Sequence, residues 1–337
     1  MVNNINDLYK KLNDSIELLR SELKSSYLDA LIEVGDDLCD HGVVRVENGI
    51  PSVKVQKKLQ ENYNFILSSI NEPKKFREIF QFILINALHN DKFDSNHQLT
   101  PDTIAYIMGY MINCLNDKTN LSIVDISVGT GNLLATILNQ LKENHNLLNI
   151  RSFGIDNDES MIAVSNINFT LQNLNTVLIH QDSLSNLSFK DSIDFVIGDL
   201  PVGYYPLNVQ NRGYKTSFDD GLSYSHYLLI EQGMNILSSS GWGLFLVPSN
   251  IFNDKKSEQL LKWINDNVYL QGIINLPSDI FKNSKSQKSL LLLQKKGKTA
   301  RQANPVLLGD IASFKNGDSF KRNINQITNW INELKEN

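Results

Sequence analysis

The stretch Asp125-Ile-Ser-Val-Gly-Thr-Gly-Asn132 decides how this sequence is expected to fold. It closes a short apolar run, Ser122–Ser127, and an amphipathic segment, Leu133–Leu141, follows at once. Glycines let the backbone turn tightly and approach a ligand without a Cβ, and a helix start presents N–H groups that lack an intrahelical partner. The spacing G-x-G-x-x-L lacks the third glycine of the dinucleotide fingerprint. The turn therefore predicts a strand–turn–helix unit, and by itself it is weak support for a ligand site.

Beyond this turn, short β-branched runs alternate with amphipathic segments, which is typical of a βαβ succession with a mostly parallel sheet. We expect an α/β fold with a Rossmann-like sheet of seven strands. The expected strands are Ser122–Ser127, Ser152–Asp156, Thr176–Gln181, Ile193–Gly198, Gly243–Val247, Leu270–Asn275 and Ser289–Gln294. The expected helices between them are Leu133–Leu141, Ser160–Leu171, His226–Leu237 and Ser257–Asn267.

The chain before Leu99 has a different pattern, because its apolar residues recur three or four positions apart and so share one helical face. A polar interruption at Gly42–Pro51 divides this part into two helical pairs. We therefore predict a small N-terminal helical domain over residues 1–92. The α/β domain would cover residues 93–337 and end in a helix from about residue 318.

Composition limits the class of protein. With 337 residues, of which 41% are hydrophobic, the chain can bury a large core. No stretch approaches the ~20 apolar residues of a membrane span, and the polar N-terminus has no apolar signal region, so we expect a cytoplasmic protein without membrane contact. Cys39 and Cys114 lie far apart with no metal-ligand spacing, so neither a disulfide framework nor a metal site is expected.

The charge is unevenly distributed along the chain. The formal net charge of -5 argues against a strongly basic coat for nucleic acid. Between Lys255 and Arg301, however, ten Lys/Arg stand against three Asp/Glu. This segment forms either a local basic face or a set of scattered surface lysines. It lacks the interleaved aromatic residues of single-strand binding grooves, which favours scattered lysines.

Three later strands also end in polar residues. They end at Asp156-Asn157, at Asp182-Ser183 and in the turn Asp199-Leu-Pro-Val-Gly-Tyr-Tyr205. Ligands of open α/β sheets bind outside the carboxyl ends of the strands, and an acid such as Asp156 there can accept both hydroxyl hydrogens of a ribose. Each of these ends alone could simply cap the following helix. Together with the glycine-rich turn, they favour a nucleoside-binding edge.

The order and spacing of these segments resemble the motifs of amino-group DNA methyltransferases. The segments are Leu99-Thr100-Pro101, Asp125–Gly131, Gly154–Asp156, Gln181-Asp182 and Asp199–Val202, with Gly272–Phe281 and Ser289–Lys295 resembling the sixth and seventh strands. The chain looks most like the modification subunits of type I restriction systems and small stand-alone bacterial proteins of the adenine-specific methylase type. The resemblance covers about His97 to Lys296, and its ordered set of motifs is specific although no single motif is. It implies a methyltransferase sheet and S-adenosylmethionine as the cofactor.

The resemblance also assigns residues to parts of the cofactor. Thr100 and Pro101 would line its methionine end. The glycine-rich turn would surround the amino acid and ribose, and the next two strand ends would hold the ribose hydroxyls and the adenine. The cofactor-binding residues implied in this way are Thr100, Pro101, Asp125, Ser127, Gly129, Gly131, Asn132, Asp156, Asn157, Asp182 and Ser183.

The last motif would hold the methyl acceptor. The family has Asn or Asp, two prolines and an aromatic residue here, so the resemblance implies Asp199, Leu200, Pro201 and Tyr204 as the catalytic set. Leu200 replaces the first proline, which relaxes the turn. Val202 replaces the aromatic residue, and stacking of a base on such a ring is worth roughly 1–3 kcal/mol. Tyr204 or its neighbour could supply the missing ring, or both could pack under the loop.

The loop Tyr204–Tyr224 directly follows this turn and contains Arg212 and Lys215. It is either a lid over the substrate or an ordinary surface loop. Methyl transfer from a sulfonium is a direct displacement that needs no metal, so alignment should dominate catalysis, an effect worth up to ~7–11 kcal/mol. DNA as the acceptor would also require base flipping.

Three functions remain open. The first is methylation of the exocyclic amino group of adenine in DNA, or RNA, with a protein partner or the helical domain supplying contacts. The second is methylation of a protein amide. The third is S-adenosylmethionine binding without catalysis, which Val202 favours. An NAD-dependent oxidoreductase is disfavoured, because the third glycine is absent and Asp199 with Pro201 offers no chemistry for hydride transfer.

Overall fold

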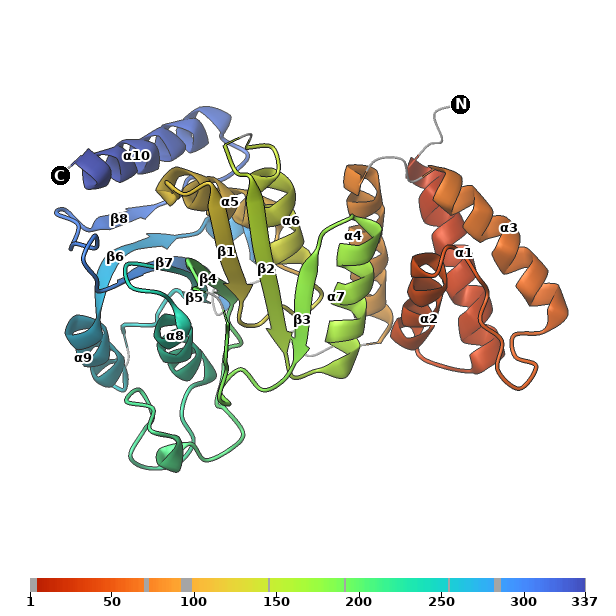
Figure 1. Ribbon diagram of the computed structural model, residues 1–337, viewed down its shortest axis with the longest axis horizontal. Helices are drawn as coiled ribbons and strands as arrows, with labels where there is room; N and C mark the ends of the chain where they lie inside the picture. Colours follow the sequence, from red (N-terminus) through yellow and green to blue (C-terminus); the bar gives the residue numbers. More distant parts are fainter. Residues whose placement is uncertain are drawn as a thin grey trace.

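The computed structural model describes residues 5–69, 73–91, 99–144, 146–190, 192–253, 255–281 and 286–336. Three helices, α1 (Ile5–Leu23), α2 (Tyr27–Cys39) and α3 (Val53–Ser69), lie together at one end of the molecule (Figure 1). A fourth, α4 (Pro73–Asn90), lies between them and the sheet. The predicted N-terminal helical domain is thus confirmed, whereas its predicted boundary at residues 92 and 93 lies outside the described residues.

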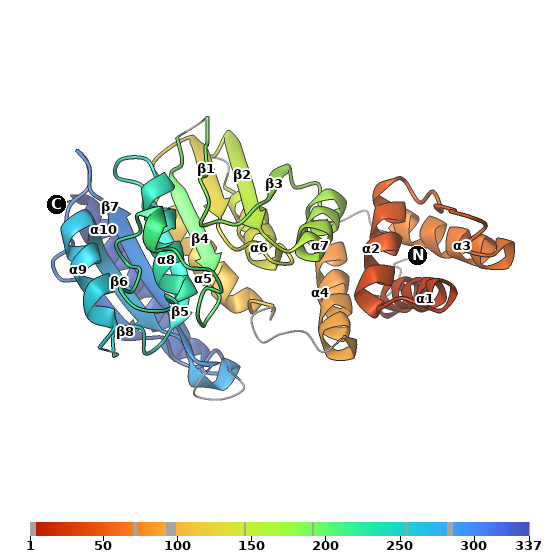
Figure 2. The same cartoon turned by 90° about the horizontal axis from the view of Figure 1, so that it is seen from below.

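The helical domain has its own apolar core. On α1, Leu8, Leu12, Ile16 and Leu19 follow the predicted spacing and are at most 3% exposed. The same core includes side chains from one face of α7 (Glu159–Leu171), a helix of the α/β domain. Figure 2 shows α7 and α4 between the sheet and the other three helices. The helical domain is therefore packed directly onto the α/β domain.

The described residues form one sheet of eight strands, in the order β3-β2-β1-β4-β5-β7-β6-β8. Within the described residues, β7 is antiparallel to both of its neighbours and all other neighbouring pairs are parallel. The strands are β1 (Asn120–Asp125), β2 (Asn149–Asp156), β3 (Thr176–His180), β4 (Phe195–Asp199), β5 (Trp242–Pro248), β6 (Val268–Asn275), β7 (Lys288–Lys295) and β8 (Leu307–Asp310).

The predicted Rossmann-like α/β class is confirmed, but the predicted count of seven strands is wrong. The additional strand, β8, pairs with β6 at the edge of the sheet. It is only four residues long and mostly exposed, so no alternation of apolar and polar residues marks it in the sequence.

Both faces of the sheet are covered by helices. On one face lie α5 (Asp102–Leu115), α6 (Asn132–Leu141) and α10 (Gly317–Glu336), and on the other lie α8 (Ser225–Ile236) and α9 (Ser257–Asn267). Adjacent residues of a strand therefore enter different cores, as Ile123 and Val124 do. This explains why the central strands β1, β4, β5 and β7 are nearly continuous apolar runs.

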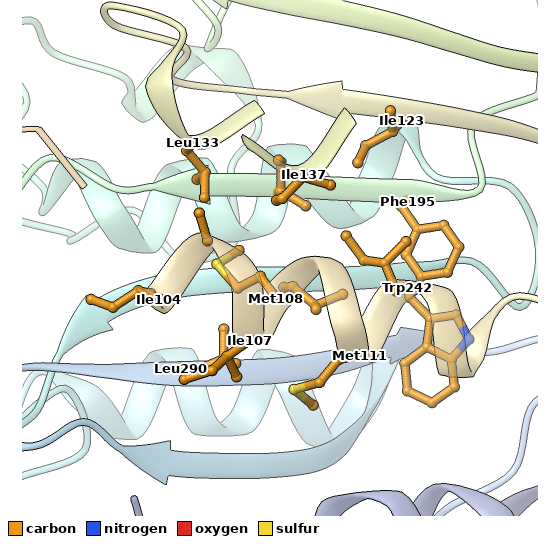
Figure 3. Packing of buried hydrophobic residues seen from close by; sticks show 14 of the residues in the cluster. Ile104, Ile107, Met108, Met111, Ile123, Leu133, Ile137, Phe195, Trp242 and Leu290 are labelled. Atoms are coloured by element: carbon orange, nitrogen blue, oxygen red, sulfur yellow. The ribbon is translucent and has the colours of Figure 1, made fainter. Parts of the chain in front are cut away.

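Helix α5 was not among the predicted helices, and it fills the centre of one core. Figure 3 shows its residues Ile104, Met108 and Met111 among side chains of the sheet and of α6, such as Trp242 and Ile137. It begins directly after Thr100 and Pro101, so its packing determines where the loop before it lies.

The strand order reverses beside β1, because β2 and β3 lie on one side of it and β4 lies on the other. The carboxyl ends of these parallel strands consequently meet at one edge of the sheet, the position at which open α/β sheets bind ligands. Among the described residues, every helix is too short or too polar to serve as a membrane span.

Candidate functional site

The glycine-rich turn connects β1 to α6 in a left-handed backbone conformation. Gly129 has φ +51° and Gly131 has φ +76°. A Cβ on Gly131 would stand 2.9 Å from Phe169 Cζ, so the close approach of α7 requires glycine there. A Cβ on Gly129 would have no atom within 4 Å, so the space beside that residue is open. The Gly129 N–H donates to Asp156 Oδ2 at 2.8 Å, which joins the ends of β1 and β2.

A cavity of about 480 Å³ lies over this turn at the carboxyl ends of β1, β2 and β4. Most residues that the sequence singled out line it, from five separate parts of the chain. They are Thr100, Ser127, Gly129, Asn132, Asp156, Asn157, Asp182, Ser183, Asp199, Pro201 and Tyr204. Four others, Pro101, Asp125, Gly131 and Leu200, do not line it.

Asp125 lies under the turn and is fully buried. Its Oδ1 accepts a hydrogen bond from the Ser127 N–H at 3.1 Å, and its Oδ2 has no partner among the described residues. Burial raises the pKa of Asp125 to about 8, and the carboxylates of Asp156 and Asp199 act in the same direction. The carboxyl group is therefore largely protonated at neutral pH. It stabilises the turn through its hydrogen bond to the Ser127 N–H.

Asp199 ends β4 at the cavity wall, and both of its carboxylate oxygens have partners. Thr100 Oγ1 donates to Oδ2 at 2.8 Å, and Lys288 at the start of β7 forms an ion pair with Oδ1. Ser127 Oγ donates to the Asp199 carbonyl at 3.3 Å. Lys288 was missed by the sequence analysis, because nothing in its local pattern indicates that β7 lies near β4.

The turn after Asp199 divides between core and cavity. The Leu200 side chain is fully buried in the core below α8, while Val202 is 45% exposed. Pro201 lines the cavity, and its carbonyl is hydrogen-bonded to the His226 ring. Burial lowers the pKa of His226 to about 4, and the charge of Lys288 acts in the same direction, so this ring is neutral at physiological pH.

Tyr204 brings an aromatic ring to the mouth of the cavity, where it is 53% exposed. Its backbone pairs with that of Tyr224, and the two rings lie 4.8 Å apart at 30°. Lys256 Nζ lies 5.4 Å from the centre of the Tyr204 ring. The loop therefore closes on itself at its two ends and presents one exposed ring beside Pro201.

Tyr205 also lines the cavity, and it lies beside Asp182. Its hydroxyl donates to Asp182 Oδ2 at 2.6 Å, and Arg212 Nη1 donates to the same oxygen at 3.1 Å. Burial by itself would raise the pKa of Asp182, but the hydrogen bonds from Tyr205, the Leu184 backbone and Arg212 together lower it. The loop Tyr204–Tyr224 is thus fastened to the end of β3, and Asp182 already has partners on the side where an adenine amino group was expected.

The site has no recognisable metal centre: no group of three or more His, Cys, Asp or Glu side chains in the described ranges could hold a metal ion. The arrangement instead offers carboxylates, amide side chains and one exposed aromatic ring around an open cavity. These groups suit a nucleoside-containing ligand above the glycine-rich turn and a second, planar ligand beside Tyr204.

Comparison with family models gives two matches. A model described as N-6 DNA methylase matches residues 71–336, and a model described as the YtxK N-terminal helical domain matches residues 6–88. Among curated proteins, the chain is 32% identical to the uncharacterized protein YtxK of Bacillus subtilis (strain 168), over 97% of this chain and 98% of that protein. It is 21% identical to the type I restriction enzyme EcoEI methylase subunit of Escherichia coli, over 76% of this chain and 53% of that subunit.

Solved structures show the same architecture. A Listeria monocytogenes protein assigned to the class I S-adenosylmethionine-dependent methyltransferases superposes with a TM-score of 0.87 at 33% identity, covering 97% of this chain and 98% of that one. A modification subunit assigned to a type I restriction enzyme of Vibrio vulnificus superposes with a TM-score of 0.65 at 16% identity, covering 82% of this chain and 62% of that one. The second likeness concerns the fold alone.

Proposed function

This chain belongs to the N-6 DNA methylase family, and from that membership we propose that it methylates the exocyclic amino group of adenine in DNA. Family membership makes S-adenosylmethionine the cofactor. The acceptor is the part that we propose, because the chain spans only about half, 53%, of the restriction methylase subunit that it matches.

The cavity fits this cofactor in size and in chemistry. Its volume of about 480 Å³ lies within the roughly 300–1,000 Å³ of most small-ligand sites. We propose that Asp156 and Asn157 hold the ribose and adenine, and that the backbone of Ser127 and Gly129 faces the amino-acid part, with Asp125 acting indirectly beneath the turn. Gly131 and Pro101 would likewise act by shaping the backbone, since their side-chain positions lie outside the cavity wall.

The single observation that carries the proposal is the position of Asp199. It stands in the wall of the same cavity as Asp156, so one ligand could lie over the glycine-rich turn while an acceptor approaches from Pro201. When bound, the cofactor supplies an electrophilic methyl group. Asp199 would accept a hydrogen bond from the target amine and aim the nitrogen lone pair at that methyl carbon. The cofactor, held over the turn that contains Ser127 and Gly129, would supply the methyl group to this nitrogen.

Tyr204 is our candidate for the ring that Val202 does not supply. It is exposed at the cavity mouth and supported from behind by Tyr224. A flipped base could stack on the exposed part of this ring, which would contribute roughly 1–3 kcal/mol. Tyr205 is a poor candidate, because its hydroxyl is bound to Asp182.

One specific observation favours an alternative function, S-adenosylmethionine binding without methyl transfer. Lys288 and Thr100 already occupy both oxygens of Asp199, so an incoming amine must share an oxygen with one of them. Methylation of a protein amide has no separate support from the geometry. A cytoplasmic location, a protein partner for the helical domain and the domain boundary near residue 92 also remain proposals.

Two measurements test the function. Calorimetric titration with S-adenosylmethionine and with NAD should give heat only with the former, and no heat would refute the cofactor assignment. Transfer of tritiated methyl to DNA, RNA and cell extract should then be compared between the native chain and Asp199→Ala. We expect label in DNA that the substitution abolishes while cofactor binding persists. Label that is independent of Asp199 would refute the acceptor site, and binding without label would favour the non-catalytic candidate.

A further inference from the structure

Helix α4 of the helical domain reaches the cavity wall of the α/β domain. Arg77 on α4 is only 7% exposed. Its Nη1 donates to Asp102 Oδ2 at 2.7 Å and to Thr136 Oγ1 at 3.0 Å, and its Nη2 donates to the Tyr106 hydroxyl at 3.0 Å. One buried guanidinium thereby joins α4 to both α5 and α6. Helix α5 follows Thr100 and Pro101, and α6 follows the glycine-rich turn.

Gln81 lies one helical turn after Arg77 and therefore on the same face of α4. Its Nε2 donates to Asn132 Oδ1 at 2.8 Å, and it also hydrogen-bonds to Asp102. Asn132 is the first residue of α6, is 4% exposed and lines the cavity. A residue of the helical domain thus directly contacts the glycine-rich turn.

The contact continues to the acceptor side of the cavity. Asn132 Nδ2 donates to the Thr100 carbonyl at 2.9 Å, and Thr100 Oγ1 donates to Asp199 Oδ2 at 2.8 Å. A hydrogen-bonded path therefore runs from Gln81 through Asn132 and Thr100 to the carboxylate that ends β4. Thr100 is 6% exposed, so most of this path is shielded from water.

The path depends on the direction of the Asn132 amide. Its oxygen accepts from Gln81 and its nitrogen donates to the Thr100 carbonyl. Since the two ends of an amide have opposite hydrogen-bonding character, rotation by half a turn would lose both bonds. Gln81 is therefore the group that holds the Asn132 nitrogen on Thr100.

We propose that Gln81 is a positioning residue of the methyltransferase site, through which the helical domain holds the Asn132 and Thr100 wall of the cavity in its binding geometry. This rests on the proposed function for its role in methyl transfer. The positioning itself is a property of the fold and can be measured independently.

Two substitutions at Gln81 remove its hydrogen bonds to Asn132 and Asp102 in different ways. Gln81→Met removes the donor. Gln81→Glu keeps the shape but offers only acceptors, so the Asn132 amide should turn its nitrogen toward position 81 and leave the Thr100 carbonyl. Gln60→Met is the matched control, because Gln60 Nε2 donates to the Gly42 carbonyl at 3.0 Å within the helical domain and away from the cavity.

Affinity for S-adenosylhomocysteine, amide hydrogen exchange and thermal unfolding should be measured on the full chain. We expect both Gln81 variants to bind S-adenosylhomocysteine about tenfold more weakly, the factor that one hydrogen bond is worth. Exchange should become faster in residues 100–104 and 132–136. The Gln60→Met variant should unfold at a lower temperature with affinity and exchange at the cavity unchanged.

A double-mutant cycle tests whether Gln81 acts through Asn132. Adding Gln81→Met to Asn132→Ala should cause no further loss of affinity. Full additivity would overturn the proposal, and so would Gln81 variants that differ from native only in unfolding temperature. If the native chain does not bind S-adenosylhomocysteine, the proposed function fails, and the exchange rates at residues 100–104 then decide the positioning role alone.

Discussion

Lys288 at the start of β7 forms an ion pair with Asp199 at the end of β4, although β5 lies between the two strands. The side chains are 23% and 19% exposed, so the pair is partly shielded from water. The Lys288 ammonium offsets the charge of the Asp199 carboxylate, which we propose binds the methyl acceptor.

Replacing Lys288 should change which form of the cofactor is preferred. In Lys288→Met the Asp199 carboxylate is no longer offset, which favours the sulfonium cation of S-adenosylmethionine over the neutral thioether of S-adenosylhomocysteine. We expect the affinity ratio to shift by about fivefold, since even water-screened unit charges interact by ~1 kcal/mol at short range. Calorimetry with both compounds measures the ratio. Lys298→Met, at an exposed position, is the control, and an equal ratio in both variants would contradict the prediction.

Removing the Tyr204 ring should weaken binding of a flipped base. Tyr204→Ala should bind an adenine-containing single-stranded oligonucleotide about fivefold to a hundredfold more weakly, corresponding to the ~1–3 kcal/mol of one stacked base. Tyr204→Phe keeps the ring and should bind like the native chain. Fluorescence anisotropy gives both affinities, and equal binding by the two variants would exclude this ring as the stacking surface.

Asp125 should make the protein less stable as the pH rises. The pKa of Asp125 is about 8 in the folded chain and ~3.9 in an unfolded one, so only the folded state holds the proton between these values. The contribution of this group to stability is therefore complete below about pH 4 and falls by about 1.4 kcal/mol per pH unit up to about pH 8. Asp125→Asn keeps an uncharged acceptor for Ser127 and abolishes this dependence.

Urea unfolding at pH 5, 6.5 and 8 tests this directly. As the pH rises, the free energy of unfolding of the native chain should fall relative to that of Asp125→Asn. Asp266→Asn, at an exposed position, should follow the native chain at all three values. Parallel curves for the native chain and Asp125→Asn would show that this carboxyl group is ionised when buried.

The two glycines of the turn should differ in their tolerance of alanine. Gly131→Ala combines a left-handed backbone, which costs ~1–2 kcal/mol, with a Cβ 2.9 Å from Phe169, and such overpacking costs ~1–3 kcal/mol. Gly129→Ala has only the first of these costs, because its Cβ would stand in open space. Denaturant unfolding should show the larger loss for Gly131→Ala, and equal losses would contradict the close approach of α7.

Local pattern was sufficient for most of the elements. The spacing of Leu8, Leu12 and Ile16 predicted α1, because a helix with one buried face has apolar residues three or four positions apart. The apolar run before Asp125 predicted β1, because a strand covered on both faces is apolar at successive positions. The pattern failed for β8, whose residues are mostly exposed, and for α5, whose less buried positions include the aromatic residues Tyr106 and Tyr110 and so give only a weak polar face.

The sequence by itself determined the α/β class, the helical N-terminal domain and the family, because turns such as Asp125–Asn132 and the order of strand ends are written in neighbouring residues. Only the tertiary structure decided which side chains meet at the site. Lys288 and Asp199 are 89 positions apart, and Gln81 and Asn132 are 51 positions apart. Such pairs depend on strand order and helix packing, which local periodicity does not encode. The ion pair of Asp199 with Lys288, and the contact of α4 with the cavity wall through Gln81, are therefore properties of the folded chain.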